Sequence, residues 1–325
     1  MKICEIREIC VTIPMKTVKA VAPYIHPEYL NFKTAPYQAW VKLGGKTAKP
    51  HYPARLFHKL VFKHELPMFW KNKKEARLRF VESLSLSFDT FPDYACYEVI
   101  PFVWDCWPIY FEQTCEWFAK HDVKTAIFTS AQTADRMQYR FPKMNILTIT
   151  EGIDTAKYPE GKPLSDRKCN LMEIGSKWRN YFSRLEPQNY DKLCNSPYKG
   201  RRMSDSEFLE MLGDSKVTVV LPKCVTEPWI AGDVETLTQR YWECMLSRIV
   251  MVGVAPKELT ELIGYNPVIA FDKEHASDQV WDIIHHIDEY QELVNKNRET
   301  ALRHASWEPR IELIKQFLMA HNYTI

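Results

Sequence analysis

Residues 235–250 read Glu-Thr-Leu-Thr-Gln-Arg-Tyr-Trp-Glu-Cys-Met-Leu-Ser-Arg-Ile-Val. Within this stretch Thr238–Ser247 predicts a helix, and the apolar run Ile249–Val252 predicts a buried strand. Another buried strand is predicted just upstream, over Val217–Leu221. A strand, a helix and a second strand in this order are typical of a β/α unit with parallel strands, so the stretch indicates an α/β fold.

The alternation of strands and helices continues on both sides of this stretch. The other predicted strands are Ile100–Trp104, Lys124–Thr129, Asn145–Ile149, Cys169–Ile174 and Pro267–Phe271. The other predicted helices are Ile109–Lys120, Ala131–Tyr139, one that opens at the capping box of Ser204 and Glu207, a short one from Pro256, and those that complete the chain from about Ser277.

A polar stretch with Pro159, Gly161 and Pro163 separates two such runs and is the best candidate for a linker. A chain of 325 residues is long enough for two domains. We therefore expect an α/β fold of two Rossmann-like β/α domains facing a cleft, with residues 1–158 in the first domain and 159–325 in the second.

In the first 80 residues the predicted strands and helices alternate less regularly. The apolar run Ala39–Leu43 has the length of a short strand. Pro53 suits the first turn of a helix that ends at Pro67, and a second helix is expected over Lys73–Ser83.

Several classes of protein are excluded by composition. The longest apolar run is the eight residues Ile249–Pro256, whereas a membrane-spanning helix needs about 20. The N-terminal residues lack the apolar core of a secretory signal. The nine cysteines form no Cys-X-X-Cys pair, which is typical of unpaired thiols in a reducing compartment. We therefore expect a cytoplasmic protein.

The net charge of +2 hides an asymmetry along the chain. Residues 1–80 hold 16 Lys and Arg against 5 Asp and Glu, and the basic segment 42–79 alone holds 11 against 2. Three interpretations stay open: a solvated face, a surface that docks on the anionic inner leaflet of a membrane, and a nucleic-acid site. Nucleic acid is the least supported partner, because no nucleic-acid motif accompanies the charge.

Three nucleotide-binding patterns are absent. Gly45-Lys46-Thr47 would need a glycine where Trp40 stands to complete a P-loop, and neither Gly-X-Gly-X-X-Gly nor Asp-X-Asp occurs. Glu235 and Glu243, in contrast, flank the start of a helix whose N-terminus lies at the carboxyl ends of the strands, where α/β folds bind ligands. A carboxylate there suits a ribose diol; the alternative is two solvated glutamates on a surface helix.

Residues 235–243 resemble the E-x7-E signature of two-domain GT-B glycosyltransferases of the "group 1" type. The closer likeness is to the branch whose helix reads T-x-R-x-x-E, which Thr238, Arg240 and Glu243 match. Further segments that resemble landmarks of this family, in the same order, are Val103–Asp105, Phe128–Ser130, Glu151–Asp154 with Tyr158-Pro159, Ile174–Arg179 and Ser306–Arg310. The chain departs from the family's pattern at Glu151, where Asn is common, and at Cys244, where Ala is common.

The resemblance implies a hexosyltransferase-like enzyme that moves a sugar from a nucleotide-diphosphate donor to a glycan or lipid-linked acceptor in surface polysaccharide synthesis, with retention of configuration. It implies that the last helix packs back on the first domain. The donor site would comprise Gly175, Lys177, Arg179, Thr238, Arg240 and Glu243. Glu235 would approach the transferred sugar, and Asp105 would act on the acceptor side. Without Asp-X-Asp we expect no metal and no cofactor besides the nucleotide sugar.

Two alternatives remain from the sequence. A sugar-nucleotide epimerase of the same fold needs further acid/base carboxylates, which the sequence does not place. A basic binding protein that has lost activity is disfavoured by the presence of Lys177, Arg240 and Glu243.

Overall fold

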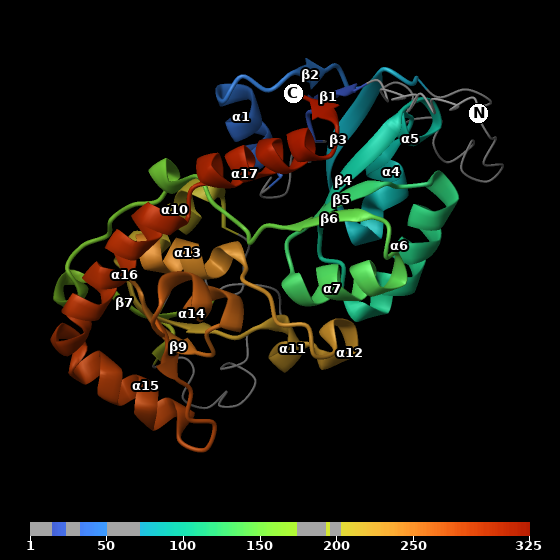
Figure 1. Ribbon diagram of the computed structural model, residues 1–325. Coiled ribbons are helices and arrows are strands. Elements are labelled where there is room, and N and C mark those ends of the chain that lie inside the picture. Colours follow the sequence, from blue (N-terminus) through green and yellow to red (C-terminus); the bar gives the residue numbers. More distant parts are fainter. Residues whose placement is uncertain (1–14, 24–32, 51–71, 174–192, 196–202) are drawn as a thin grey trace, which may run out of the picture.

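The computed structural model describes residues 15–23, 33–50, 72–173, 193–195 and 203–325. It contains two parallel sheets, each within its own lobe (Figure 1). Seven described strands form the first sheet in the order β11-β1-β3-β4-β5-β6, with β2 beside β1. These strands are β1 (Lys16–Val21), β2 (Thr47–Ala48), β3 (Glu75–Glu82), β4 (Glu98–Trp104), β5 (Thr125–Phe128), β6 (Asn145–Thr148) and β11 (Tyr323–Thr324).

Helices cover both faces of the first sheet. On one face α1 (Thr34–Lys42) and α17 (Trp307–Ala320) pack against apolar side chains of β1, β3 and β4. On the other face α6 (Pro108–His121) and α7 (Ala131–Arg140) pack against β4 and β5. Two short helices, α4 (Leu86–Thr90) and α5 (Asp93–Cys96), follow β3.

The segment expected to form a helix over Lys73–Ser83 is the strand β3, so that prediction was wrong. This strand lies between β1 and β4, and its six middle residues are buried. Arg77 and Arg79 interrupt the apolar sequence pattern that indicates a buried strand, although both side chains are nearly fully buried. Their charges are met by Glu75, 2.8 Å from Arg77, and by Asp93, 3.0 Å from Arg79.

The apolar run Ala39–Leu43 forms the last turn and the C-cap of the helix α1 and not a strand. Pro36, Ala39 and Trp40 are buried, and this spacing of three and four residues defines one helical face. The Trp40 indole donates a hydrogen bond of 2.9 Å to the Lys46 carbonyl, which holds the following turn against the helix. The helix expected from Pro53 lies outside the described residues.

The second sheet has four described strands in the order β10-β9-β8-β7. They are β7 (Cys169–Met172), β8 (Ser215–Val220), β9 (Val250–Gly253) and β10 (Ile269–Ala270). Its helices are α10 (Asp205–Asp214), α11 (Lys223–Thr226), α12 (Pro228–Ala231), α13 (Gln239–Leu246), α14 (Lys257–Ile263), α15 (Ala276–His285) and α16 (Gln291–His304). Helices α10, α13 and α14 pack on one face and α15 on the other.

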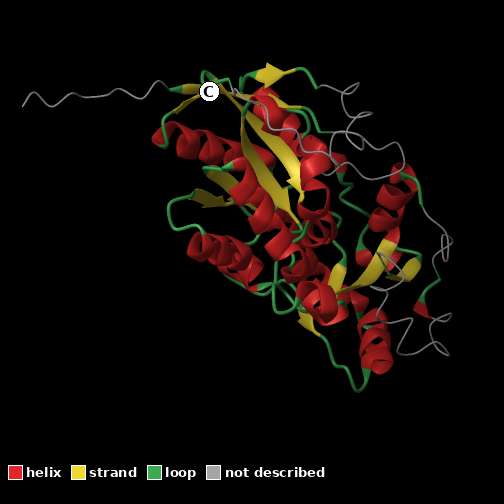
Figure 2. Cartoon of the chain, turned by 90° about the vertical axis from the view of Figure 1, so that its right-hand side faces the viewer, coloured by secondary structure: helices red, strands yellow, loops and turns green. Residues whose placement is uncertain are grey.

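The chain passes between the sheets twice, and the two passages lie side by side. Residues after β6 lead to the second sheet, and the segment between α16 and α17 leads back. The Ile153 amide donates to the Ala305 carbonyl at 2.8 Å, and Ile153 pairs with Ser306. The turned view shows the two sheets apart from each other (Figure 2). Helix α17 packs on the first of them. Two parallel β/α sheets of this kind confirm the expected α/β fold class.

The close approach of β8 and β9 generates a prediction about stability. Gly253 has φ +152°, and a Cβ built on it would lie 1.8 Å from the Val220 carbonyl oxygen. We expect Gly253→Ala to lower the free energy of unfolding by about 2–4 kcal/mol, measured by urea denaturation, because the two strands must separate locally.

Gly264 provides the matched control, since it has φ +78° but nothing within 4 Å of its Cβ position. Gly264→Ala therefore carries only the conformational cost of about 1 kcal/mol. Equal losses in both variants would contradict the packing argument.

Candidate functional site

A cleft of about 260 Å³ lies between the sheets, where β4, β8 and the N-terminus of α13 meet. It is lined by Trp104, Asp105, Trp107, Glu151, Val219, Val220, Leu221, Pro222, Lys223, Thr238, Gln239, Arg240, Tyr241 and Glu243. Both sheets present the carboxyl ends of their strands to it, which is where open α/β sheets bind ligands. Four predicted site residues therefore meet here: Asp105 from the first sheet, and Thr238, Arg240 and Glu243 from the second.

Asp105 follows β4 directly and stands at the cleft with its side chain exposed. Its φ of +52° is in the left-handed region, which L-residues with a side chain rarely adopt. Backbone conformations of this kind cost free energy and recur at functional sites. The structure thus holds the Asp105 carboxylate at the cleft by a strained turn.

Glu243 lies on the buried side of α13, with only 5% of the residue exposed. The Tyr158 hydroxyl donates to Glu243 Oε1 at 3.2 Å, and Arg240 Nε lies 3.3 Å from Oε2. Burial and the Glu243 charge raise the pKa of Tyr158, so its hydroxyl stays protonated and keeps donating. These contacts fix the carboxylate at the wall of the cleft.

Arg240 is held only in part. Its Nε faces Glu243, whereas Nη1 is buried and has no hydrogen-bond partner among the residues that the structure describes. The cleft also contains Lys223, whose Nζ lies 5.0 Å from the centre of the Trp107 ring. Lys223 belongs to no recognisable sequence motif, so it was not predicted as a site residue. Buried N–H groups without partners are rare, so this side of the cleft suits an anionic ligand.

Glu235 lies in the loop before α13 and is half-buried. Its amide donates to Gln132 Oε1 at 2.6 Å, so the backbone is tied to α7 of the first sheet. Glu235 is not one of the residues that line the cleft defined above. The remaining predicted donor residues, Gly175, Lys177 and Arg179, lie outside the described residues.

Glu151 is the acidic residue that sequence reasoning left out of the site. It lies in the passage from β6 to the second sheet, lines the cleft, and is 8% exposed. The Gln239 amide, at the start of α13, donates to Glu151 Oε2 at 3.1 Å. Burial, and next the Asp105 charge, raise the pKa of Glu151 well above its ordinary value. The sequence signal for this residue was that Glu stands at position 151, where Asn is common in the family that the chain resembles.

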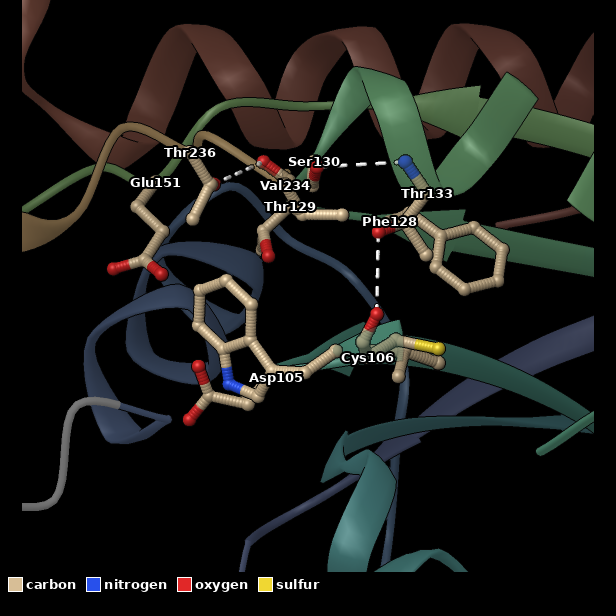
Figure 3. Close-up of a pocket in the computed structure, with 11 residues that line it drawn as sticks. Asp105, Cys106, Phe128, Thr129, Ser130, Thr133, Glu151, Val234 and Thr236 are labelled. Atoms are coloured by element: carbon tan, nitrogen blue, oxygen red, sulfur yellow. Dashed lines mark hydrogen bonds between the residues drawn. The ribbon is translucent and has the colours of Figure 1, made fainter. Parts of the chain in front are cut away.

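A narrow pocket of about 10 Å³ opens beside the cleft, and both Asp105 and Glu151 line it. Figure 3 shows the two carboxyl groups directed to the same side of this pocket. Thr236 contributes from the second sheet and donates to the Thr129 carbonyl at 3.5 Å. The pocket has room for about one water molecule, and its polar lining provides partners for one.

The loop between α12 and α13 is fastened to the first sheet. Glu258 of α14 accepts hydrogen bonds from the Ala131 amide at 2.9 Å and the Leu237 amide at 2.8 Å. Burial raises the pKa of Glu258, while the two amides act in the opposite direction. An ion pair of 2.7 Å joins Arg136 to Asp233. These bonds join the loop and α14 to α7 of the first lobe.

The basic segment 42–79 is described only on either side of residues 51–71. Arg77 and Arg79 are buried within the first lobe and add nothing to a surface charge. Lys49, Lys73 and Lys74 are exposed.

The part of the chain that the structure describes holds no group of three metal-ligating side chains. None of the helices there has the length and apolarity needed to cross a bilayer.

The fold is that of the GT-B glycosyltransferases. No family model matches the sequence, and no curated protein matches it. Among solved structures, HepE (Alr3699) of Anabaena in complex with UDP-glucose has a TM-score of 0.58 and 9% identity, covering 94% of this chain and all of HepE. The structure of TarM has a TM-score of 0.54 and 12% identity, covering 81% of this chain.

The TarM comparison is partial, since the chain spans 57% of the TarM chain. A mutant of TarM from S. aureus, in complex with fondaparinux, alpha-GlcNAc-glycerol and UDP, has a TM-score of 0.52 at 11% identity. The match covers 81% of this chain and 58% of the mutant's chain.

The raised pKa of Glu151 predicts a pH-dependent stability. The folded protein binds this proton more tightly than the unfolded chain, so the contribution is complete below about pH 4.5 and is lost as pH rises through the raised pKa. Glu151→Gln keeps an acceptor for the Gln239 amide but cannot ionise. We expect the free energy of unfolding of this variant, relative to wild type, to rise with pH above about pH 4.5 in urea denaturation.

Glu299→Gln, on the exposed side of α16, is the control and is expected to show no such trend. The same trend in both variants, or none in Glu151→Gln, would contradict the assignment.

Proposed function

We propose that the protein is a glycosyltransferase that uses a nucleotide-diphosphate sugar. The observation that carries this proposal is Glu243, buried at the cleft and fixed by Tyr158 and Arg240, with Asp105 presented from the other sheet. In the proposal residues 159–325 bind the donor, residues 1–158 bind the acceptor, and the last helix belongs with the first domain. Glu243 accepts hydrogen bonds from the ribose hydroxyls.

The donor diphosphate needs positive charge, because sugar transfer develops negative charge on the leaving group. Arg240 supplies an unpartnered N–H, and the N-terminus of α13 at Thr238 adds its dipole. We assign Gly175, Lys177 and Arg179 to the same subsite. The absence of Asp-X-Asp from the sequence supports transfer without a metal ion or further cofactor.

The reaction breaks the bond between the anomeric carbon and the diphosphate and forms one to an acceptor hydroxyl. Asp105 is the polar group of the first sheet at the cleft and is assigned to the acceptor side. Glu235 is assigned to the transferred sugar, and retention of configuration follows from the family resemblance. HepE carries UDP-glucose and the TarM mutant carries UDP, which favours a uridine nucleotide for this chain.

Glu243→Gln tests the donor site. We expect it to weaken binding of UDP and UDP-glucose at least about tenfold in calorimetric titration, because a carboxyl group with two oxygens for the two hydroxyls is replaced by an amide with one acceptor oxygen. Thermal unfolding monitors the fold. Glu210→Gln, on the exposed side of α10, is the control.

Unchanged affinity in Glu243→Gln would remove the basis of the assignment. Formation of a new sugar nucleotide without any acceptor would instead indicate the epimerase, which the Asp105 and Glu151 carboxyl groups at one cleft favour as the second candidate.

The acceptor is proposed to be a glycan or lipid-linked sugar in surface polysaccharide synthesis, reached at the cytoplasmic face of a membrane. Exposed Lys49, Lys73 and Lys74 flank residues 51–71 of the basic segment and support peripheral binding to an anionic leaflet.

Sedimentation with vesicles of phosphatidylglycerol and phosphatidylcholine tests this proposal. We expect binding that falls steeply with salt and weakens when Lys49, Lys73 and Lys74 are changed to Glu. The same change at exposed Lys143, Lys168 and Lys273 is the control. Binding that does not depend on salt would contradict the electrostatic attachment.

A further inference from the structure

The acidic residue beside the N-terminus of α13 in the cleft is Glu151. Glu235, which the resemblance assigns to the transferred sugar, precedes the helix and does not line this cleft. Glu151 comes from a different part of the chain, the passage between the sheets, yet its Oε2 accepts the Gln239 amide of the same helix. The position next to the start of α13 is therefore taken by a residue far away in sequence.

The geometry of Glu151 leaves one oxygen for a ligand. The Gln239 amide donates to Glu151 Oε2 at 3.1 Å, and the main-chain carbonyl of Glu151 accepts a hydrogen bond from the Trp242 indole N–H at 2.8 Å. Within the described part of the chain no donor is hydrogen-bonded to Oε1. Both neighbouring cavities are lined by Glu151, and the Asp105 carboxyl group points to the same side (Figure 3).

The surroundings suit a sugar ring. Trp104, Trp107 and Tyr241 line the cleft together with the two carboxyl groups. The three rings are 1–4% exposed and give the cleft an apolar wall, and carboxyl oxygens accept the hydroxyls of a sugar. Trp107 is 4% exposed, and its indole Nε1 has no hydrogen-bond partner in the described ranges. At the wall of the cleft such an indole N–H can donate to a sugar hydroxyl oxygen.

We propose that Glu151 and Asp105, with the Trp107 N–H, bind the hydroxyl groups of the transferred sugar, so that Glu151 takes the role assigned above to Glu235 and Asp105 faces the transferred sugar as well as the acceptor. This inference rests on the proposed function. The raised pKa of Glu151 supports it, because a protonated carboxyl group both donates to and accepts from a hydroxyl. The charged groups around Glu151 are Asp105 after β4, Arg240 and Glu243 of α13, and Glu258 of α14.

The experiment separates the sugar from the nucleotide. Calorimetric titration gives the Kd of UDP and of UDP-glucose for wild type, Glu151→Gln, Glu151→Ala and Glu235→Gln, and the same is done for the GDP, ADP and dTDP pairs. The quantity compared is the ratio of the two Kd values for each protein. A residue that only supports α13 changes both values together and leaves the ratio unchanged.

We expect Glu151→Ala to lower the affinity for the nucleotide sugar about tenfold or more while the Kd of the nucleoside diphosphate stays within about twofold of wild type. Glu151→Gln is expected to change the ratio in the same direction and by less, because its amide still accepts a hydroxyl. Glu235→Gln is expected to keep the wild-type ratio.

Two results would overturn the inference while leaving the proposed function in place. One is a ratio of the two Kd values that equals the wild-type ratio in both Glu151 variants. The other is a ratio that changes in Glu235→Gln alone. Failure of the wild-type protein to bind any of the nucleotides would instead overturn the proposed function, and the inference with it.

Discussion

The contact between Glu151 and α13 connects the two sheets. One residue of the passage binds the helix twice, through its carbonyl to the Trp242 indole and through its carboxyl group to the Gln239 amide. A carboxylate at a helix N-terminus is favourable, whereas burial next to Asp105 is not. The position of α13 relative to β4, and so the shape of the cleft, depends on this balance.

The same contact explains why the cleft gathers acidic groups. Asp105, Glu151 and Glu243 line it, and Glu258 lies close to Glu151 at the fastened loop. Burying several carboxyl groups together lowers stability, and proteins retain such arrangements where function requires them. This distribution of charge matches a ligand with many hydroxyl groups, which need acceptors. The anionic part of such a ligand would be bound by Arg240 and Lys223.

The sequence predicted most of the architecture because its strands after residue 98 are short apolar runs with clear ends. It failed at β3, where Arg77 and Arg79 are buried and paired with Glu75 and Asp93. Glu75 lies two residues from Arg77 on the same strand, whereas Asp93 approaches Arg79 only in the folded chain. It failed at α1, where the run Ala39–Leu43, apolar except for Lys42, resembles a strand although the buried spacing is helical.

The site was predictable where its residues share one helix. Thr238, Arg240 and Glu243 lie within six positions, so their spacing alone carries the pattern. Glu151, Trp107 and Lys223 are distant in sequence and meet only because the passage after β6, the end of β4 and the loop after β8 converge. No local pattern marks such residues, although the Glu at position 151 departed from the common Asn.

A crystal structure of the wild-type protein with UDP-glucose would show where the nucleotide and its sugar bind. We expect the diphosphate beside Arg240 and the N-terminus of α13, the ribose on Glu243, and the sugar between Asp105 and Glu151. A nucleotide bound elsewhere on the chain, with this cleft unchanged and empty, would contradict the account.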